Sequence, residues 1–224
     1  MNYASIRKMD ISNGEGVGVA LFVQGCHFHC YNCFNFETWD FNGGKRWTDE
    51  VKNKFLDLID KPYIKRVSIL GGEPLANENV ESILNLVKEI RKRYPKSQKT
   101  AKNIMNIVNN GYKNSNIYNK NQDEIRLSFP TKNIWLYSGY TWKQVMNPVV
   151  TDDLNPNRDK IIKMRQDIIK QCNVFVDGRY VDELRDLTLH WRGSSNQRVI
   201  DVQKTLQSKE IVLYDENKSK QKTK

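Results

Sequence analysis

The sequence predicts an α/β protein built on a parallel sheet with crossover helices. Short apolar segments rich in β-branched residues recur along the 224 residues, and segments with helical spacing of apolar residues alternate with them. This alternation is typical of parallel sheets, because a parallel connection needs a crossover. The length suits a single domain with a substantial core, which we expect to span residues 1–214.

The predicted elements follow one another in a regular order. Val17 to Val23 is a short apolar run bounded by glycines, which predicts a buried strand. Thr48 is a suitable N-cap, and the apolar residues after it fall on one helical face as far as Ile59. Further strands are predicted at residues 67–70, 134–137 and 174–176, and further helices at residues 80–94 and 161–169.

The formal charge of +10 is concentrated in two segments. Residues 96–133 carry a net charge of +5, and residues 218–224 add four lysines without an acid. Most of residues 97–131 lacks a helical or alternating pattern, which indicates an insertion, and residues 215–224 are predicted to form a disordered basic tail. Proteins that read duplexes more often carry basic residues on a structured element, so this distribution argues against nucleic-acid binding as the main role.

The apolar segments are short throughout the chain. None approaches the roughly 18 consecutive apolar residues of a membrane-spanning helix, and the N-terminus lacks the apolar core of a secretory signal. We therefore expect a cytoplasmic protein without a membrane partner. Disulfides are rare in the cytosol, so clustered cysteines there indicate metal binding or catalysis.

Three of the four cysteines form such a cluster directly after the first predicted strand. Cys26, Cys30 and Cys33 have the spacing C-x3-C-x2-C. Three thiolates from one loop can bind three irons of a [4Fe–4S] cubane and leave the fourth iron without a protein ligand. Electron-transfer clusters are normally fully ligated, so an open iron indicates a binding site for a substrate or cofactor.

A structural zinc site is the alternative interpretation of these cysteines, with Cys172, His27 or His29 completing the ligand set. Zinc ligands usually come as two matching pairs, and the sequence contains no second pair. Cys172 stands alone before a predicted strand and is expected to pack as a small buried hydrophobe. The two histidines are expected at the loop surface or in packing contacts.

A second motif, Gly71-Gly72-Glu73-Pro74, follows the second predicted strand. Two glycines allow close backbone approach, so that carbonyls can accept hydrogen bonds from a ligand ammonium. Alone, the motif could equally be a tight connection from strand to helix. Ligands of parallel sheets gather at the carboxyl ends of the strands, where we expect this turn and the cysteine loop.

The cysteine loop and a Gly-Gly-Glu-Pro turn some 38 residues later together resemble the radical S-adenosylmethionine (SAM) enzymes. The resemblance implies that Cys26, Cys30 and Cys33 hold a [4Fe–4S] cluster whose open iron binds SAM. Reductive cleavage of SAM there gives a 5′-deoxyadenosyl radical. Many members carry an aromatic residue before the third cysteine, whereas this chain has Asn32, so the adenine contact would come from backbone or from Phe34.

Further motifs resemble the activating proteins of anaerobic (class III) ribonucleotide reductase. They are Asn2-Tyr3, Asp10-Ile11, Asn13-Gly14, Cys33-Phe34-Asn35, Thr38-Trp39, residues 134–140, residues 176–180 and Trp191–Gln197. The resemblance implies an incomplete (βα) barrel of the radical SAM type. It also implies that the radical abstracts hydrogen from a glycine of the large reductase subunit. That subunit and a reducing electron donor such as flavodoxin or ferredoxin are the implied partners.

The resemblance also implies which residues bind SAM. They are Asn32, Cys33, Phe34, Gly71, Gly72, Glu73, Ser138 and Asp177, with Gly139 beside Ser138. Ser138 and Asp177 end later strands and could equally be turn residues. Trp191–Gln197 either docks the reductase or packs on the barrel. We expect no catalytic side chain, because the cofactor radical performs the abstraction.

Two other functions stay open at this point. One is an activase for another glycyl-radical enzyme, of the formate-lyase type, against which the Trp191–Gln197 motif argues. The other is a zinc-stabilised basic binding module without catalysis. The insertion and the lysine-rich tail have no counterpart in the family that we can place.

Overall fold

The computed structural model describes residues 1–96, 131–148 and 156–214. Apart from Thr131, the predicted insertion lies outside the described residues, as does the tail at 215–224. In chain order the elements are β1 (Asn2–Asp10), β2 (Gly18–Val23), η1 (Phe36–Thr38), β3 (Lys45–Arg46), α1 (Asp49–Ile59), β4 (Arg66–Gly71), α2 (Asn77–Arg93), β5 (Asn133–Ser138), α5 (Trp142–Met146), α6 (Arg158–Gln171), β6 (Val174–Asp177), η2 (Asp182–Leu184), β7 (Arg198–Asp201) and α7 (Val202–Ser208).

A seven-stranded sheet organises these elements, in the order β3-β1-β2-β4-β5-β6-β7. The four central strands are parallel, as the alternating pattern predicts. The outer strands β1, β3 and β7 pair antiparallel, so the sheet is mixed and the prediction of a parallel sheet is right only for its centre. In the described part of the chain the two end strands do not pair with each other, so this sheet is open.

The register of the central strands brings their carboxyl ends to one level. Strand β2 pairs with β4 from Gly18 opposite Arg66 to Val23 opposite Gly71. Ser138 at the end of β5 pairs with Asp177 at the end of β6. The segments that leave these four strands, including both sequence motifs, therefore start at the same edge of the sheet.

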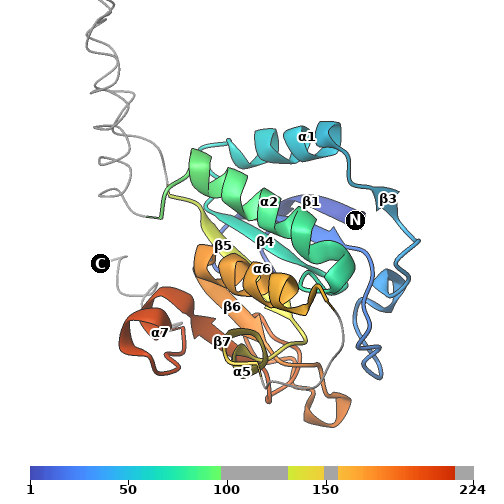
Figure 1. The fold of residues 1–224 in the computed structure, drawn as a ribbon, viewed down its shortest axis with the longest axis vertical. Helices are drawn as coiled ribbons and strands as arrows, with labels where there is room; N and C mark the ends of the chain where they lie inside the picture. Colours follow the sequence, from blue (N-terminus) through green and yellow to red (C-terminus); the bar gives the residue numbers. More distant parts are fainter. Residues whose placement is uncertain (97–130, 149–155, 215–224) are drawn as a thin grey trace, which may run out of the picture.

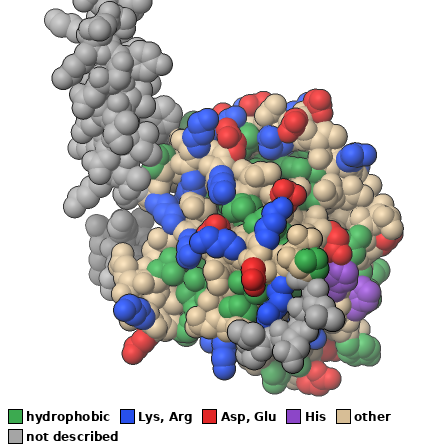
Figure 2. All heavy atoms as spheres, in the orientation of Figure 1, with side chains coloured by type: hydrophobic (Ala, Val, Ile, Leu, Met, Phe, Trp, Pro, Cys, Tyr) green, Lys and Arg blue, Asp and Glu red, His purple; other side chains and the backbone are tan. Residues whose placement is uncertain are grey.

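Helices α1, α2 and α6 lie over one face of the sheet (Figure 1). The main apolar core fills the space between them and that face, with completely buried side chains such as Leu21, Ile69, Leu136, Phe55 and Ile83. Charged side chains of both signs are spread over the outer, helical side (Figure 2). Burial of this face stabilises the sheet, while the opposite face carries smaller apolar clusters, one of them around Trp135 and Val176.

The opposite face carries a buried polar cluster where the central strands begin. Arg66 is fully buried and donates to the Asp10 carboxylate at 2.9 Å and to the Asp10 carbonyl at 2.7 Å. Asn13 donates through its backbone and its side chain to the same carboxylate. Gly14 has a φ of +126°, and a Cβ there would lie 2.5 Å from Arg66 Cδ. The Asp10 and Asn13-Gly14 motifs thus hold the loop between β1 and β2 on the sheet.

The predicted central elements are confirmed, whereas the outer ones were missed. All four predicted strands and all three predicted helices are present, with Thr48 capping α1 by accepting from the Val51 amide. Strand β1 is largely solvent-accessible and polar, and β7 has four residues, so neither has a continuous apolar pattern. Among helices in the described residues, none is both long and apolar enough to cross a membrane.

Candidate functional site

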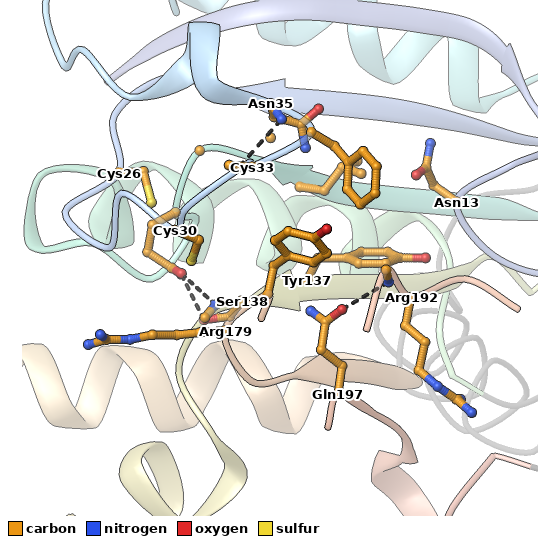
Figure 3. Close-up of a pocket in the computed structure, with 18 of the residues that line it drawn as sticks. Asn13, Cys26, Cys30, Cys33, Asn35, Tyr137, Ser138, Arg179, Arg192 and Gln197 are labelled. Carbon is orange, nitrogen blue, oxygen red and sulfur yellow. Dashed lines mark hydrogen bonds between the residues drawn. The ribbon is translucent and has the colours of Figure 1, made fainter. Parts of the chain in front are cut away.

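The segments that follow the four parallel strands surround a cavity of about 500 Å³. The cysteine loop leaves β2, the Gly-Gly-Glu turn leaves β4, and Ser138 and Gly139 end β5. Residues of the segment 178–197, between β6 and β7, and residues of β1 and the loop after it also line the cavity. Figure 3 shows Cys26 and Cys30 at one end of the cavity and Asn13 and Arg192 at the other.

All three clustered cysteines line the cavity as half-buried free thiols. The loop is bound to the rest of the molecule at its start, where the Gly25 amide donates to the Thr38 carbonyl at 2.8 Å. Its last cysteines form a turn in which the Cys33 amide donates to the Cys30 carbonyl at 3.1 Å. His29 and Asn32 adopt left-handed backbone, with φ of 45° and 52°. Such conformations in residues other than glycine are concentrated at functional sites.

The surroundings of the thiols suit ligands of a metal cluster. Burial raises the pKa of the Cys26 thiol to about 11, and burial together with the neighbouring Cys33 raises the pKa of Cys30. Metal coordination deprotonates a thiol outright. A backbone N–H group is already directed at one of the sulfurs, because Asn35 donates to Cys33 Sγ at 3.4 Å. Hydrogen bonds of this kind tune iron–sulfur clusters.

The residues that would complete a zinc site are engaged elsewhere. His27 Nε2 lies 3.0 Å from a carboxylate oxygen of Glu78, and the His29 ring stacks on Trp39 at a centroid distance of 4.6 Å. Cys172 is completely buried, as predicted, and its thiol donates to the Ile168 carbonyl. Within the described residues, no group of three or more His, Cys, Asp or Glu side chains could hold a single metal ion.

The Gly-Gly-Glu-Pro turn packs directly under the cysteine loop. The Gly72 amide donates to the Val23 carbonyl at 2.9 Å, and the Glu73 amide donates to the Gly25 carbonyl at 2.7 Å. A Cβ at Gly72 would lie 2.5 Å from that Gly25 carbonyl oxygen, and Gly71 has a φ of +104°. Close approach to the chain leaving β2 therefore already requires both glycines.

Glu73 is buried and joins the ends of two strands. Its carboxylate accepts from the Leu75 amide, the Ser138 hydroxyl and the Gly139 amide, each at 2.8 Å. Burial raises the pKa of Glu73 to about 7, while these three donated bonds act against the rise. The structure thus gives Glu73 a bracing role between the turn after β4 and the end of β5.

Two of the predicted cofactor contacts lie outside the cavity lining. Asp177 is buried, and its carboxylate accepts from the Arg198 guanidinium and from the Trp142 amide at 2.7 Å. Asn32 donates through Nδ2 to a carboxylate oxygen of Asp182 at 2.8 Å. The other predicted residues line the cavity, namely Cys33, Phe34, Gly71, Gly72, Glu73, Ser138 and Gly139.

Several lining residues were missed by the sequence analysis. They come mainly from β1, β5 and the segment 178–197, and include Arg7, Tyr137, Arg179 and Tyr180. The guanidinium of Arg179 lies over the Phe28 ring, 4.3 Å from its centre. Arg179 and Tyr180 belong to the motif at residues 176–180, which resembles the reductase-activating proteins. That motif was the sequence signal by which these two residues could have been found.

The Trp191–Gln197 motif both packs on the sheet and reaches the cavity. The Trp191 ring contacts Trp135 edge-on at a centroid distance of 4.9 Å. Gln197 Oε1 accepts from the Gly193 amide at 2.9 Å, and Gln197 Nε2 donates to the Gly178 carbonyl. Trp191, Gly193 and Gln197 also line the cavity. The Trp191–Gln197 segment thus packs on the sheet, which is one of its two predicted roles. Because three of its residues also line the cavity, the second role, docking of the reductase, stays a prediction.

The comparison with known families agrees with a site for one iron–sulfur cluster at the cysteine-lined cavity. The family model described as a 4Fe-4S single cluster domain matches residues 12–126 and 112–200.

Curated relatives narrow this class. The chain is 32% identical to the anaerobic ribonucleoside-triphosphate reductase-activating protein of Escherichia coli K12, over 89% of this chain and 97% of the relative. It is 29% identical to the proteins of that name from Vibrio cholerae and from Enterobacteria phage T4, over at least 88% of this chain and 93% of each relative. The chain belongs to the family of anaerobic ribonucleoside-triphosphate reductase-activating proteins.

Proposed function

We propose that this protein is a radical SAM activase, which generates a glycyl radical on the large subunit of an anaerobic ribonucleoside-triphosphate reductase. The observation that carries the proposal is the meeting of three free cysteines with the Gly-Gly-Glu turn in one cavity. Family membership over almost the whole chain supports the same activity. The four parallel strands at the centre of an open sheet support the finer assignment of an incomplete (βα) barrel.

Cys26, Cys30 and Cys33 would hold a [4Fe–4S] cluster through three of its irons. All three face the cavity as free thiols, and the sulfur of Cys33 already accepts a backbone N–H bond from Asn35. The fourth iron would be available to SAM. When bound, the cluster and SAM supply a 5′-deoxyadenosyl radical, which is the species that abstracts hydrogen.

The chain's own residues would bind SAM and orient it. We assign the methionine end to the backbone of Gly71 and Gly72, which lines the cavity beside the cysteine loop. Glu73 would act by fixing that turn and Ser138, because its carboxylate already accepts three hydrogen bonds. The exposed Phe34 ring lies at the same cavity and offers an apolar surface for adenine. Asn32 and Asp177 would contribute through the structure around the cavity.

The far end of the cavity would receive the reductase segment that bears the glycine. Arg7 and Asn13 line the cavity and carry a guanidinium and a carboxamide that could bind a peptide backbone. A buried location for that segment would protect the radical from side reactions. We further propose a reducing donor such as flavodoxin or ferredoxin, a cytoplasmic location and a single domain over residues 1–214.

The test uses the full chain purified without oxygen. Iron and sulfide should each approach about four per chain if the cluster is complete. After reduction, addition of SAM and a class III reductase should produce a glycyl-radical doublet in electron paramagnetic resonance. A doublet that forms only on an enzyme of the formate-lyase type would overturn the partner assignment. A colourless protein with one stoichiometric zinc would overturn the whole proposal.

A further inference from the structure

The turn that carries two of the three cysteines is held by a distant acidic residue. Asn32 lies between Cys30 and Cys33 and has a left-handed φ of 52°. Asparagine tolerates this conformation better than most residues, yet the conformation still needs support from its surroundings. That support comes from Asp182 in η2, whose Oδ2 accepts from Asn32 Nδ2 at 2.8 Å.

The second oxygen of Asp182 binds a residue beside the cysteines. Its Oδ1 accepts from the Tyr180 hydroxyl at 2.5 Å. Tyr180 lines the same cavity as Cys30 and Cys33. Asp182 therefore connects the side chain of Asn32 with a residue that lines the cavity next to the cysteines.

Aromatic contacts join the same two segments of the chain. The Tyr180 ring lies 5.0 Å from the Phe34 ring, measured between centroids. A Cβ at Gly193 would lie 2.7 Å from a carbon of the Phe34 ring and 3.1 Å from Tyr180, so glycine there permits this packing. The cysteine loop is thus bound to the segment 178–197 at several points, with Asp182 joining two of them.

We propose that Asp182 is a positioning residue, which fixes the Cys30–Cys33 turn through Asn32 and holds the Tyr180 ring against Phe34, next to Cys33. The inference rests on the proposed function, because it assumes that these cysteines hold the cluster. Hydrogen bonds to cluster sulfurs and the partners of metal ligands tune affinity and reduction potential. Asp182 accordingly controls how firmly the cluster is held and how readily it is reduced.

The first test compares Asp182→Ala with the wild-type protein after anaerobic cluster assembly. Loss of iron to a chelator should become about tenfold faster in the variant, the lower end of the effect seen when residues that orient metal ligands are removed. The midpoint potential, measured by a titration followed with electron paramagnetic resonance, should also shift. Glu183→Gln is the matched control, because it removes the neighbouring exposed carboxylate and should change neither quantity.

A reciprocal exchange separates this role from a general loss of structure. Asn32→Asp alone places two carboxylates against each other and should accelerate iron loss as Asp182→Ala does. In the double variant Asn32→Asp/Asp182→Asn, the new amide can donate to residue 32 and accept from the Tyr180 hydroxyl. The rate of iron loss should therefore return to within about threefold of the wild-type rate, since both hydrogen bonds are rebuilt.

Failure of this inference is distinguishable from failure of the proposed function. If the wild-type protein assembles a cluster but Asp182→Ala loses iron at the wild-type rate, Asp182 has no positioning role. If the double variant loses iron as fast as Asn32→Asp does, the hydrogen bond is not the cause. If the wild-type protein assembles no cluster, the proposed function itself fails. Hydrogen exchange of the amides at 28–34 in the cluster-free protein, which should be faster in Asp182→Ala, then still tests whether Asp182 holds the turn.

Discussion

The Gly-Gly-Glu-Pro turn and the cysteine loop lie side by side at the same edge of the sheet, yet they are held in different ways. The turn is stabilised from within the sheet, because its amides bind the chain leaving β2 and the Glu73 carboxylate accepts three hydrogen bonds. The cysteine loop has half-buried thiols and left-handed residues, and much of its support comes from the segment 178–197.

This difference indicates that the Gly-Gly-Glu-Pro turn has a structural role, whereas the cysteine loop serves to bind a ligand. Substitutions in the turn should lower the free energy of unfolding even in the cluster-free protein. Substitutions of the cysteines should prevent cluster assembly while leaving the fold intact. Predictions that compare the two regions can therefore support this division or break it.

The largest effect is expected for Cys30→Ala. The variant should assemble no stable cluster and cleave no SAM, because one of three thiolate ligands is missing. The free energy of unfolding of the cluster-free protein should change by less than about 1 kcal/mol, since the half-buried thiol fills no core position. Iron and sulfide analysis, SAM cleavage and urea unfolding check these three outcomes.

Cys172→Ala is the matched control and should behave in the opposite way. This thiol is completely buried in the main core, so its removal should cost about 1 kcal/mol of folding stability while the iron content stays at the wild-type level. Loss of iron from this variant would contradict the division between core and cluster cysteines.

A smaller but still severe effect is expected for Gly72→Ala. The added Cβ would lie 2.5 Å from the Gly25 carbonyl oxygen and 3.0 Å from the Thr38 carbonyl oxygen, and backbone cannot move aside as a side chain does. We expect a loss of about 3 kcal/mol in the free energy of unfolding, at the upper end for overpacking. Urea unfolding of the cluster-free protein measures it.

Gly16→Ala is the control for this second prediction, because a Cβ at Gly16 meets no atom within 4 Å. Its φ of +72° leaves only a backbone penalty of about 1 kcal/mol. Equal losses in the two glycine variants would show that the contact with Gly25 does not determine the conformation of the turn.

Glu73→Gln should weaken the brace between β4 and β5. The new NH2 group would face the Gly139 N–H, so that two donors would meet and neither would have an acceptor. This should lower the free energy of unfolding by about 1–2 kcal/mol. The cost should depend on pH. The folded pKa of about 7 exceeds the ordinary value of 4.5, so wild-type protein takes up a proton on folding between these values. Wild-type stability relative to the variant should therefore fall as pH rises from 4.5 to 7.

Urea unfolding of both cluster-free proteins at several pH values in this window checks the sign. The difference in the free energy of unfolding between wild type and Glu73→Gln could instead grow with rising pH. That result would mean that the three hydrogen bonds to the carboxylate outweigh the effect of burial and lower the pKa of Glu73.

The sequence predicted those parts of the molecule that depend on local pattern. Strands β2, β4, β5 and β6 have runs of buried apolar residues, and the spacing of the three cysteines is visible without a structure. Strand β1, which lies between β3 and β2, was missed because most of its residues are polar and only one of the nine is buried.

The unpredicted part of the site depends on contacts between distant segments. Asn32 meets Asp182, 150 residues later, and Arg179 meets Phe28 across a similar separation. Neither contact leaves a local pattern in the chain. Asp177 was chosen because it ends a strand, but its carboxylate binds Arg198 and the Trp142 amide. Strand ends locate a site, whereas the side chains that line it depend on tertiary packing.

The smallest effect is expected for His27→Ala, within the cysteine loop itself. His27 lies 3.0 Å from Glu78, but both side chains are about half exposed or more, so solvent screens the pair. The loss of folding stability should stay below about 1 kcal/mol, including the contact of the imidazole with Phe41. Iron content and SAM cleavage should match wild type, because this histidine points to the glutamate and away from any ligand role. A histidine variant that lost its metal would show that the loop uses its surface residues as ligands, and the contrast between a braced turn and a three-thiolate loop would no longer hold.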